Sequence, residues 1–305
     1  MMKIGLLFPG QGSQFVGMGK DFYENSAVAK EMFELASDSV KIDFKKLMFE
    51  ENEDLNKTEY TQPAILLYSA IAYELFKNSA DFEYAFSLGH SLGEFSALYS
   101  AGAIDLADAV KLVHERGKLM NAAFRDKVGS MMVVLGLDDE TIENICKESN
   151  LQVWPANYNS DGQLVLAGIR EDLEKLEPVL KEKGAKRAML LNMSVASHCP
   201  LLESASAPLK ELLAEALKDE FKDVVSNVTA KAYNTKAEAL EVLPVQLTKP
   251  VLYKQSIKNY ENDADVFVEF GGKVLMGINR KITKKKTLPI TDMASLEKVI
   301  GSLSN

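Results

Sequence analysis

Apolar runs and turn residues alternate at both ends of the chain in a pattern typical of an α/β protein. Lys3–Phe8 has the pattern of a short buried strand, and a glycine-rich turn follows it at once. Ala64–Phe76 has the composition of a buried helix, and Tyr84–Leu88 predicts the next strand. Val266–Phe270 predicts a further buried strand, and Lys273–Lys281 beyond it predicts a helix. These segments indicate a larger α/β domain formed by both ends of the chain.

The middle of the chain has a different order of elements. Its segments alternate as β-α-β-β-α-β, which is the signature of a ferredoxin-like unit. The predicted strands and helices are Ser130–Leu137, Asp139–Glu148, Leu151–Asn157, Gln163–Ala167, Glu171–Lys183 and Lys186–Asn192, with a turn at Asn159-Ser160-Asp161-Gly162 before Gln163. We therefore predict a larger domain of residues 1–125 and 198–305, with a small ferredoxin-like domain of residues 126–197 inserted into it.

Composition and charge exclude several classes of protein. The 305 residues, 47% of them hydrophobic and 26% charged, are ordinary for a globular enzyme or binding protein. No run of 18 or more apolar residues exists, so we expect no membrane span. A net charge of −9 argues against general nucleic-acid binding. The chain has two cysteines and no secretory signal, which predicts a cytoplasmic protein. It lacks a CxxC motif, so we expect no structural zinc site.

Gly89-His90-Ser91-Leu92-Gly93 lies between a predicted strand and a helical stretch that runs to about Ser100. In this context, G-x-S-x-G predicts the nucleophile elbow of an α/β hydrolase-like domain. The serine needs a sharp, strained turn so that its Oγ stands free, and the flanking glycines avoid clashes at that turn. The backbone N–H of Leu92 would then point toward an oxyanion. A structural glycine-rich turn is the alternative, but the strand-turn-helix context favours a catalytic Ser91.

A serine nucleophile needs a general base, and the chain has three histidines. His90 is the direct neighbour of Ser91, so its side chain should point away and have a structural role. His114 falls on the polar arc of its predicted helix, where we expect a solvated surface side chain. His198 lies in a loop after a strand-like segment, where catalytic groups are frequent. We therefore favour His198 as the base, and we expect Cys199 to be a small packed thiol.

Arg116 belongs to a helix predicted from a cap at Asp105 to Phe124. At about 100° per residue it falls within the apolar arc of this helix, flanked by Ala109 and Ala123. An inward arginine keeps its charge and needs an anionic partner. One interpretation is an internal salt bridge with Asp or Glu. The other is a receptor for a substrate carboxylate, which the planar guanidinium binds through both oxygens.

Several motifs together resemble one enzyme family. They are Pro9-Gly10-Gln11-Gly12-Ser13-Gln14, Gly89-His90-Ser91-Leu92-Gly93-Glu94, Arg116-Gly117 with Met120, Ser197-His198, Ser226-Asn227-Val228-Thr229-Ala230, and Gln246-Leu247 with Pro250-Val251. In this order the chain resembles the malonyl-CoA:acyl carrier protein transacylases of bacterial type II fatty acid synthesis. The resemblance implies transfer of a malonyl group from malonyl-CoA to the phosphopantetheine thiol of acyl carrier protein, by a ping-pong mechanism through a malonyl-serine ester. We expect a monomer that needs no cofactor.

The resemblance also implies the roles of individual residues. Ser91 would be the acylated nucleophile and His198 its base, and Gln11 and Leu92 would supply the N–H groups of the oxyanion hole. It further implies that Arg116 binds the malonyl carboxylate and that Asn157 of the small domain lies near the active site. The main-chain carbonyl of Gln246 would orient the histidine.

Three departures from the family pattern are visible in the chain. Ala196 stands where proline often precedes Ser-His, Leu252-Tyr253 replaces an arginine and an aromatic residue, and Gly271-Gly272 replaces a Gly-Pro-Gly turn. A serine thioesterase or esterase of the same architecture is the alternative function. It would share Ser91 and His198 but would pass the acyl group to water.

Overall fold

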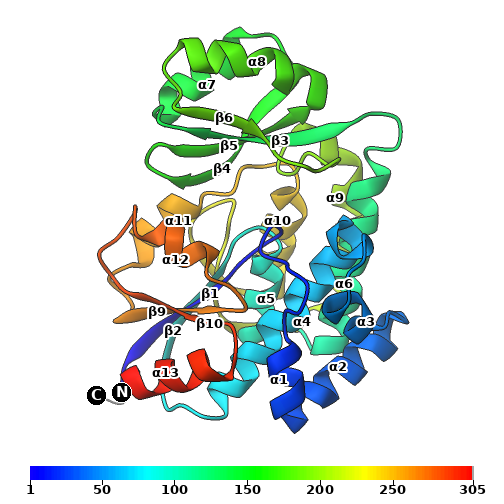
Figure 1. Ribbon diagram of the computed structural model, residues 1–305, viewed down its shortest axis with the longest axis vertical. Coiled ribbons are helices and arrows are strands. Elements are labelled where there is room, and N and C mark those ends of the chain that lie inside the picture. Colours follow the sequence, from blue (N-terminus) through cyan, green and yellow to red (C-terminus); the bar gives the residue numbers. More distant parts are fainter. Residues whose placement is uncertain (304–305) are drawn as a thin grey trace.

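The computed structural model describes residues 1–303, in which a six-stranded and a four-stranded sheet form two separate layers (Figure 1). The larger sheet has the strand order β10-β9-β1-β2-β7-β8 and is parallel except for the pair of β7 and β8. Its strands are β1 (Lys3–Phe8), β2 (Glu83–Gly89), β7 (Glu220–Val225), β8 (Ala232–Thr235), β9 (Val266–Phe270) and β10 (Thr287–Ile290). The α/β class and the parallel sheet expected from the sequence are confirmed.

Helices cover both faces of this sheet, and we call the sheet with its helices the large domain. On β1, Ile4, Leu6 and Phe8 enter the larger hydrophobic cluster, while Leu7 enters a separate cluster on the opposite face. Because both faces are covered, the strand is apolar at nearly every position. The helices of this domain are α1 (Lys20–Asn25), α2 (Ala27–Val40), α3 (Phe44–Phe49), α4 (Thr58–Lys77), α5 (Gly93–Ser100), α6 (Leu106–Ala122), α9 (Glu203–Ala216), α10 (Lys236–Gln246), α11 (Tyr253–Tyr260), α12 (Val274–Asn279) and α13 (Met293–Leu303).

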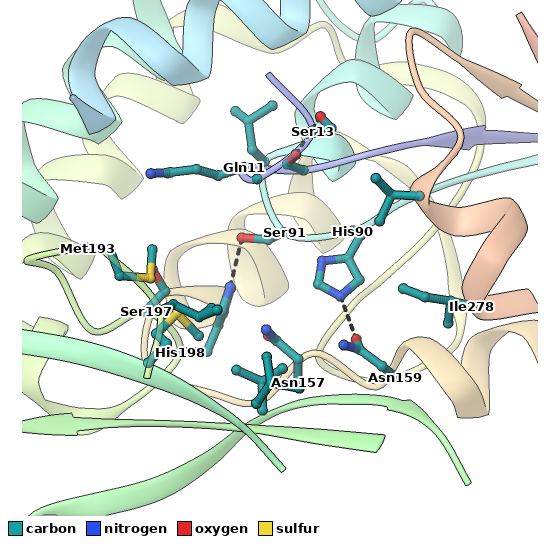
Figure 2. A pocket seen from close by; sticks show the side chains of 18 of the residues that line it. Gln11, Ser13, His90, Ser91, Asn157, Asn159, Met193, Ser197, His198 and Ile278 are labelled. Atoms are coloured by element: carbon teal, nitrogen blue, oxygen red, sulfur yellow. Dashed lines mark hydrogen bonds between the residues drawn. The ribbon is translucent and has the colours of Figure 1, made fainter. Parts of the chain in front are cut away.

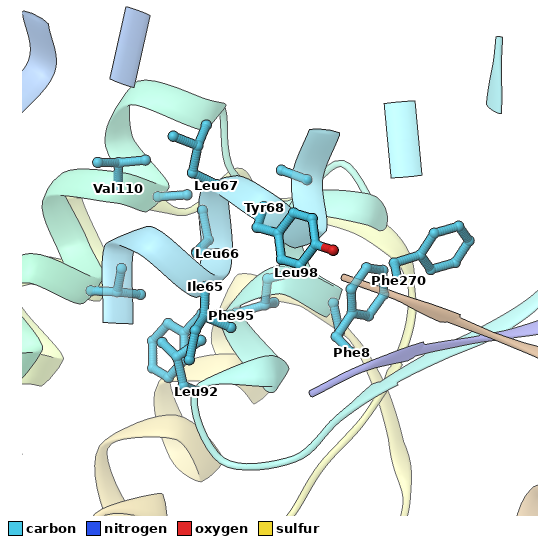
Figure 3. Packing of buried hydrophobic residues seen from close by; sticks show 14 of the residues in the cluster. Phe8, Ile65, Leu66, Leu67, Tyr68, Leu92, Phe95, Leu98, Val110 and Phe270 are labelled. Atoms are coloured by element: carbon cyan, nitrogen blue, oxygen red, sulfur yellow. The ribbon is translucent and has the colours of Figure 1, made fainter. Parts of the chain in front are cut away.

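Helix α4 is buried along almost its whole length, as expected for a helix that is apolar on all sides. Figure 3 shows its Ile65, Leu66 and Leu67 among side chains of α5, α6 and the sheet. Burial of each such side chain contributes about 1.5–3 kcal/mol. This packing holds α4 against α6, so that Gln62 of α4 reaches Arg116 of α6.

The small domain consists of the second sheet and two helices that cover its outer face (Figure 1). The sheet has the order β4-β5-β3-β6, and every neighbouring pair is antiparallel. Its elements are β3 (Gly129–Leu135), α7 (Asp139–Glu148), β4 (Val153–Ser160), β5 (Gln163–Ile169), α8 (Arg170–Glu182) and β6 (Arg187–Leu190). The other face of this sheet is turned toward the large domain and forms the roof of a cleft.

Strand β4 joins the small domain to the large one. The N–H of Val251 donates to the carbonyl of Ala156 at 2.8 Å, and the N–H of Tyr158 donates to the carbonyl of Val251 at 2.9 Å. An ion pair between Lys254 of α11 and Asp139 of α7 lies beside this connection. These contacts hold the roof at a set height above the larger sheet.

Two local predictions are wrong. Asn159 and Ser160 are not in a turn but in β4, because two register shifts let the strand continue until the turn at Asp161-Gly162. Asp105 stands at the N-cap of α6, but its side chain pairs with Lys218 at 2.6 Å instead of capping the helix. In the described part of the chain, none of the helices has the length and apolar character needed to cross a membrane.

Candidate active site

Ser91 lies on the turn between β2 and α5 with a backbone φ of 55°, in the left-handed region that non-glycine residues rarely adopt. The glycines on either side are required by close packing. A Cβ atom at Gly89 would lie 1.8 Å from the carbonyl carbon of Gly93, and one at Gly93 would lie 2.1 Å from the carbonyl oxygen of Phe8. The turn therefore brings strand, serine and helix closer together than any other residue type allows.

Figure 2 shows the side chain of His198 pointing at Ser91, with Nε2 2.7 Å from Oγ. The other ring nitrogen, Nδ1, lies 2.7 Å from the main-chain carbonyl of Gln246. Because a carbonyl only accepts, Nδ1 carries the hydrogen and Nε2 turns its lone pair toward the serine hydroxyl. Burial, together with the charge of Arg116, lowers the pKa of His198 to about 3. The imidazole is therefore neutral near pH 7 and able to accept a proton.

The loop that carries Gln11 runs directly against the elbow. A Cβ atom at Gly10 would lie only 2.3 Å from the carbonyl oxygen of His90, so the approach requires glycine. Gln11, Ser91 and Leu92 all line a cleft of about 450 Å³. Within residues 1–303, the backbone N–H groups of Gln11 and Leu92 have no acceptor, so both can donate to a group bound in the cleft.

Arg116 is 1% exposed and faces inward, as the helical pattern predicts. Its Nη1 donates to Oε1 of Gln62 at 2.8 Å, and its Nη2 donates to Oε1 of Gln246 at 2.9 Å. The guanidinium lies 5.1 Å from the ring centre of Phe95, and Nε has no partner in the described part of the chain. Burial lowers the pKa of Arg116 to about 10, so the group remains cationic near pH 7.

Arg116 therefore makes no direct salt bridge: among residues 1–303 its guanidinium donates to the amide oxygens of Gln62 and Gln246. The charge of Glu94 raises the pKa of Arg116 but acts from the far side of Gln246, so it compensates the buried cation less than a direct carboxylate partner would. Arg116 also lines the cleft that holds Ser91. The arrangement can bind an anionic group close to the serine hydroxyl.

The other two histidines differ in how well they were predicted. His90 turns its Nε2 to Oδ1 of Asn159 at 2.8 Å and packs on Tyr253, and its side chain points away from Ser91 as expected (Figure 2). His114 is not a solvated surface residue: it is buried, and Nδ1 lies 2.7 Å from the carbonyl of Glu59. The reason is that α4 packs closely against α6. The first turn of α4 covers the polar arc of α6, where His114 lies.

Two asparagines of the roof line the cleft. Asn157 and Asn159 line the cleft from β4, and two positions apart on a strand they lie on the same face. Oδ1 of Asn157 has no partner in the part of the chain that the structure describes. Asn159 was not predicted as a site residue, because its segment has the composition of a turn.

Asn227 is a second residue whose place in the site only the structure reveals. Its Oδ1 accepts the N–H of Ser91 at 2.7 Å, and its Nδ2 donates to the carbonyl of Gly89 at 2.6 Å. The side chain of Gln246 adds a bond of 3.1 Å from Nε2 to the carbonyl of Ser91. Both amides thus stabilise the strained turn from behind, which no local pattern indicates.

Other reactive chemistry is not evident near the cleft. Cys199 is buried and free, and burial raises the pKa of its thiol to about 11, which leaves little nucleophilic thiolate near pH 7. No group of three or more His, Cys, Asp or Glu side chains gathers as a metal site within residues 1–303. The reactive groups of the cleft are therefore Ser91, His198 and Arg116.

Sequence comparisons find relatives over the full chain. The family model of the acyl transferase domain matches residues 6–304. The malonyl CoA-acyl carrier protein transacylase of Bacillus subtilis strain 168 is 41% identical over 312 residues, covering 99% of this chain and 98% of its own. The protein of the same name from Escherichia coli K12 is 39% identical and covers 94% of this chain and 95% of its own.

Solved structures agree with these matches. The crystal structure of malonyl-CoA:acyl carrier protein transacylase from Helicobacter pylori has a TM-score of 0.97 and 49% identity, covering 100% of this chain and 99% of its own. A type II PKS acyl-carrier protein in complex with its malonyl-transacylase matches with a TM-score of 0.94 and 36% identity, over 98% of this chain and 99% of that chain.

Proposed function

This chain belongs to the acyl transferase family, among its malonyl CoA-acyl carrier protein transacylases, and we propose that it makes a malonyl ester on Ser91 as the intermediate of its reaction. The enzyme transfers a malonyl group from malonyl-CoA to the phosphopantetheine thiol of acyl carrier protein. The observation that carries the proposal is the combination of a Ser91–His198 contact of 2.7 Å with an inward Arg116 that has no carboxylate partner among the described residues.

In the first half-reaction, Nε2 of His198 takes the proton of the Ser91 hydroxyl while Oγ attacks the thioester carbonyl. The N–H groups of Gln11 and Leu92 stabilise the oxyanion that forms. The C–S bond then breaks, and His198 returns its proton to the sulfur of coenzyme A. In the second half-reaction the carrier-protein thiol gives its proton to His198 and its sulfur attacks the malonyl ester. The bond between the acyl carbon and Oγ then breaks, and His198 returns the proton to Oγ of Ser91.

The carbonyl of Gln246 orients His198 in place of the carboxylate that many serine enzymes use. A carbonyl fixes the tautomer but adds no negative charge next to the ring. The neutral His198 is therefore a weak base. Its position at hydrogen-bond distance from the Ser91 hydroxyl, rather than its basicity, makes it effective. Asn157 lines the cleft from the roof, where its side chain can help to position the acyl-carrying arm.

The finer architecture belongs to the same proposal. We take the turn at Ser91 as a hydrolase-type nucleophile elbow, supported by its positive φ and by the two sterically required glycines. We take residues 126–197 as a ferredoxin-like small domain, supported by the strand order β4-β5-β3-β6 and its antiparallel pairs. The active site then lies where the roof of one domain meets the elbow of the other.

Intact mass spectrometry tests this function directly. Malonyl-CoA alone should add one malonyl group to the protein, and acyl carrier protein in its phosphopantetheinylated form should then remove it and gain the same mass. Ser91→Ala should abolish labelling, whereas Ser13→Ala, a serine of the same cleft, should not. Labelling of the Ser91→Ala variant, or release of free malonate as fast without carrier protein as with it, would contradict the proposal.

A further inference from the structure

Glu94 is a buried carboxylate directly behind the serine turn, and the reaction as derived above does not use it. It is 1% exposed and lies in the first turn of α5, the helix that follows the elbow. Its Oε1 accepts the hydroxyl of Tyr233 at 3.0 Å. Its Oε2 accepts Nε2 of Gln246 at 2.7 Å and the N–H of Asn227 at 3.2 Å. These are the same two amide residues that support the turn at Ser91.

The side chain of Gln246 connects Glu94 to Arg116 in one defined direction. Arginine only donates and a carboxylate accepts, so Oε1 of the amide must face Arg116 and Nε2 must face Glu94. The amide group of Gln246 thus separates the guanidinium from the carboxylate. The cation keeps an open side toward the cleft, while its counter-charge lies behind the amide.

We propose that Glu94 sets the charge of the malonyl-carboxylate site through Gln246, and so controls how strongly the enzyme prefers malonyl to uncharged acyl groups. The inference rests on the proposed binding of malonyl by Arg116. When a malonyl carboxylate binds, two anions share one buried cation. An ionised Glu94 therefore weakens malonyl binding, and a protonated Glu94 strengthens it.

Ionisation of Glu94 lies in a range that solution pH can reach. Burial raises the pKa of Glu94 to about 7, against hydrogen bonds from Gln246, Asn227 and Tyr233 that lower it. The charge of Arg116 on α6 also lowers it, and burial keeps Tyr233 of β8 protonated far above neutral pH. Gln246 of α10 and Asn227 after β7 do not titrate, and His198, beyond the carbonyl of Gln246, stays neutral.

The sign of the effect follows from these groups. Glu94 is ionised above its pKa and competes for Arg116, and it is neutral below it. The ratio of kcat/KM for malonyl-CoA to kcat/KM for acetyl-CoA should therefore rise as the pH falls from 8.5 to 5.5. Coupling between two sites is commonly fivefold or more, so we expect a rise of roughly fivefold. Effects of pH on Ser91, His198 or the thioester act on both substrates and cancel in the ratio.

The test is this ratio in wild type and in Glu94→Gln, measured by acylation of Ser91 with each thioester. Glutamine preserves the geometry, since its oxygen can accept from Gln246 and Asn227 while its amide donates to the oxygen of Tyr233. The variant should have a ratio that does not change with pH and equals the acid limit of the wild type. A wild-type ratio that is flat with pH, or a Glu94→Gln ratio that still follows the wild-type curve, overturns the proposal.

Glu269→Gln is the matched control, because burial raises the pKa of Glu269 to about 7 as well. Its oxygens accept the N–H groups of Leu275 and Met276, with no link to Arg116. This variant should keep the wild-type dependence of the ratio on pH. Loss of that dependence in Glu269→Gln would assign it to a different group and overturn the role of Glu94.

Tyr233→Phe provides a second variant if Glu94→Gln does not fold. It removes a hydrogen bond that lowers the pKa of Glu94, so the change in the ratio should move to higher pH. If the ratio in Tyr233→Phe changes at the same pH as in wild type, the proposal is contradicted. Failure of malonyl transfer itself would appear in wild type as an absence of Ser91 labelling, which is distinct from a labelled enzyme whose ratio ignores pH.

Discussion

Arg116 and Lys254 are both buried cations on helices of the large domain, but their surroundings are opposite. Lys254 is 10% exposed at its side chain and lies between two carboxylates of the small domain, Asp139 and Asp161, the latter at 3.0 Å. Burial alone would lower the pKa of Lys254, but hydrogen bonds to Asp139 and Asp161 outweigh it and raise the pKa. Where Lys254 has two carboxylates, Arg116 has two neutral amide oxygens as hydrogen-bond acceptors, and burial lowers the pKa of Arg116.

The difference separates a structural cation from a receptor. A cation that already has carboxylate partners gains little from a further anion, so Lys254 serves to join the domains. A cation held by amides keeps its position without losing its affinity for an anion. Loss of Lys254 should therefore affect folding, and loss of Arg116 should affect which acyl group is transferred.

The largest effect is expected at His198, because this residue acts in the transfer of both malonyl and acetyl groups. His198→Ala should slow acylation by about 10²–10⁴-fold, which is the usual contribution of a general base. The loss should be equal for malonyl-CoA and acetyl-CoA, since His198 acts on the serine and not on the acyl tail. Rapid-quench acylation with both thioesters measures this. A loss confined to malonyl-CoA would place His198 with Arg116 in carboxylate binding instead.

Lys254→Met should lower the free energy of unfolding and leave the malonyl-to-acetyl ratio unchanged. Removing one partner of a buried pair is costly, but Asp161 is 69% exposed, so we expect about 1–2 kcal/mol. Urea denaturation measures it. Lys258→Met is the control, because Lys258 is half-exposed and forms an ion pair with Asp161 at 3.4 Å. This change should alter stability by less than about 0.5 kcal/mol. Equal stability of both variants would remove the structural half of the comparison.

The smallest effect is expected at the surface, where a third kind of cation lies. Arg280 and Lys281 are exposed beside the cleft, and Lys281 approaches Gln163 of the roof at 3.5 Å. Replacing both with glutamate should raise KM for an acidic carrier protein by roughly three- to tenfold at low salt and leave acylation by malonyl-CoA intact. Reversal of Lys20 and Lys30, on α1 and α2, should not. An unchanged KM in the first variant would exclude this surface from docking.

Much of this arrangement could be predicted from the sequence because its signals are local. The strands at Lys3–Phe8 and Val266–Phe270 have the predicted bounds, since continuous apolar runs next to glycine turns leave little choice. The inward face of Arg116 followed from helical spacing. Burial of His114 could not be predicted in the same way, because it depends on how closely α4 approaches α6, and only the small Gly117 near the contact hinted at it.

The supporting residues of the site were the hardest to predict. Asn227 and Gln246 reach Ser91 across separations of more than a hundred residues, and no periodicity within either segment indicates that they meet. The partners of Arg116 come from α4 and α10, so the choice between salt bridge and receptor could not be made on one helix. Long-range packing decided both questions.

The most direct test of the central claim is kcat/KM of Arg116→Ala for malonyl-CoA and acetyl-CoA. A charged, two-pronged hydrogen bond exceeds about 1.4 kcal/mol, so malonyl transfer should fall at least about tenfold, while acetyl transfer should stay unchanged or improve. Arg116→Lys should restore malonyl transfer only in part, since an ammonium lacks the planar fork. Equal losses for the two thioesters in a folded Arg116→Ala variant would show that Arg116, like Lys254, is structural.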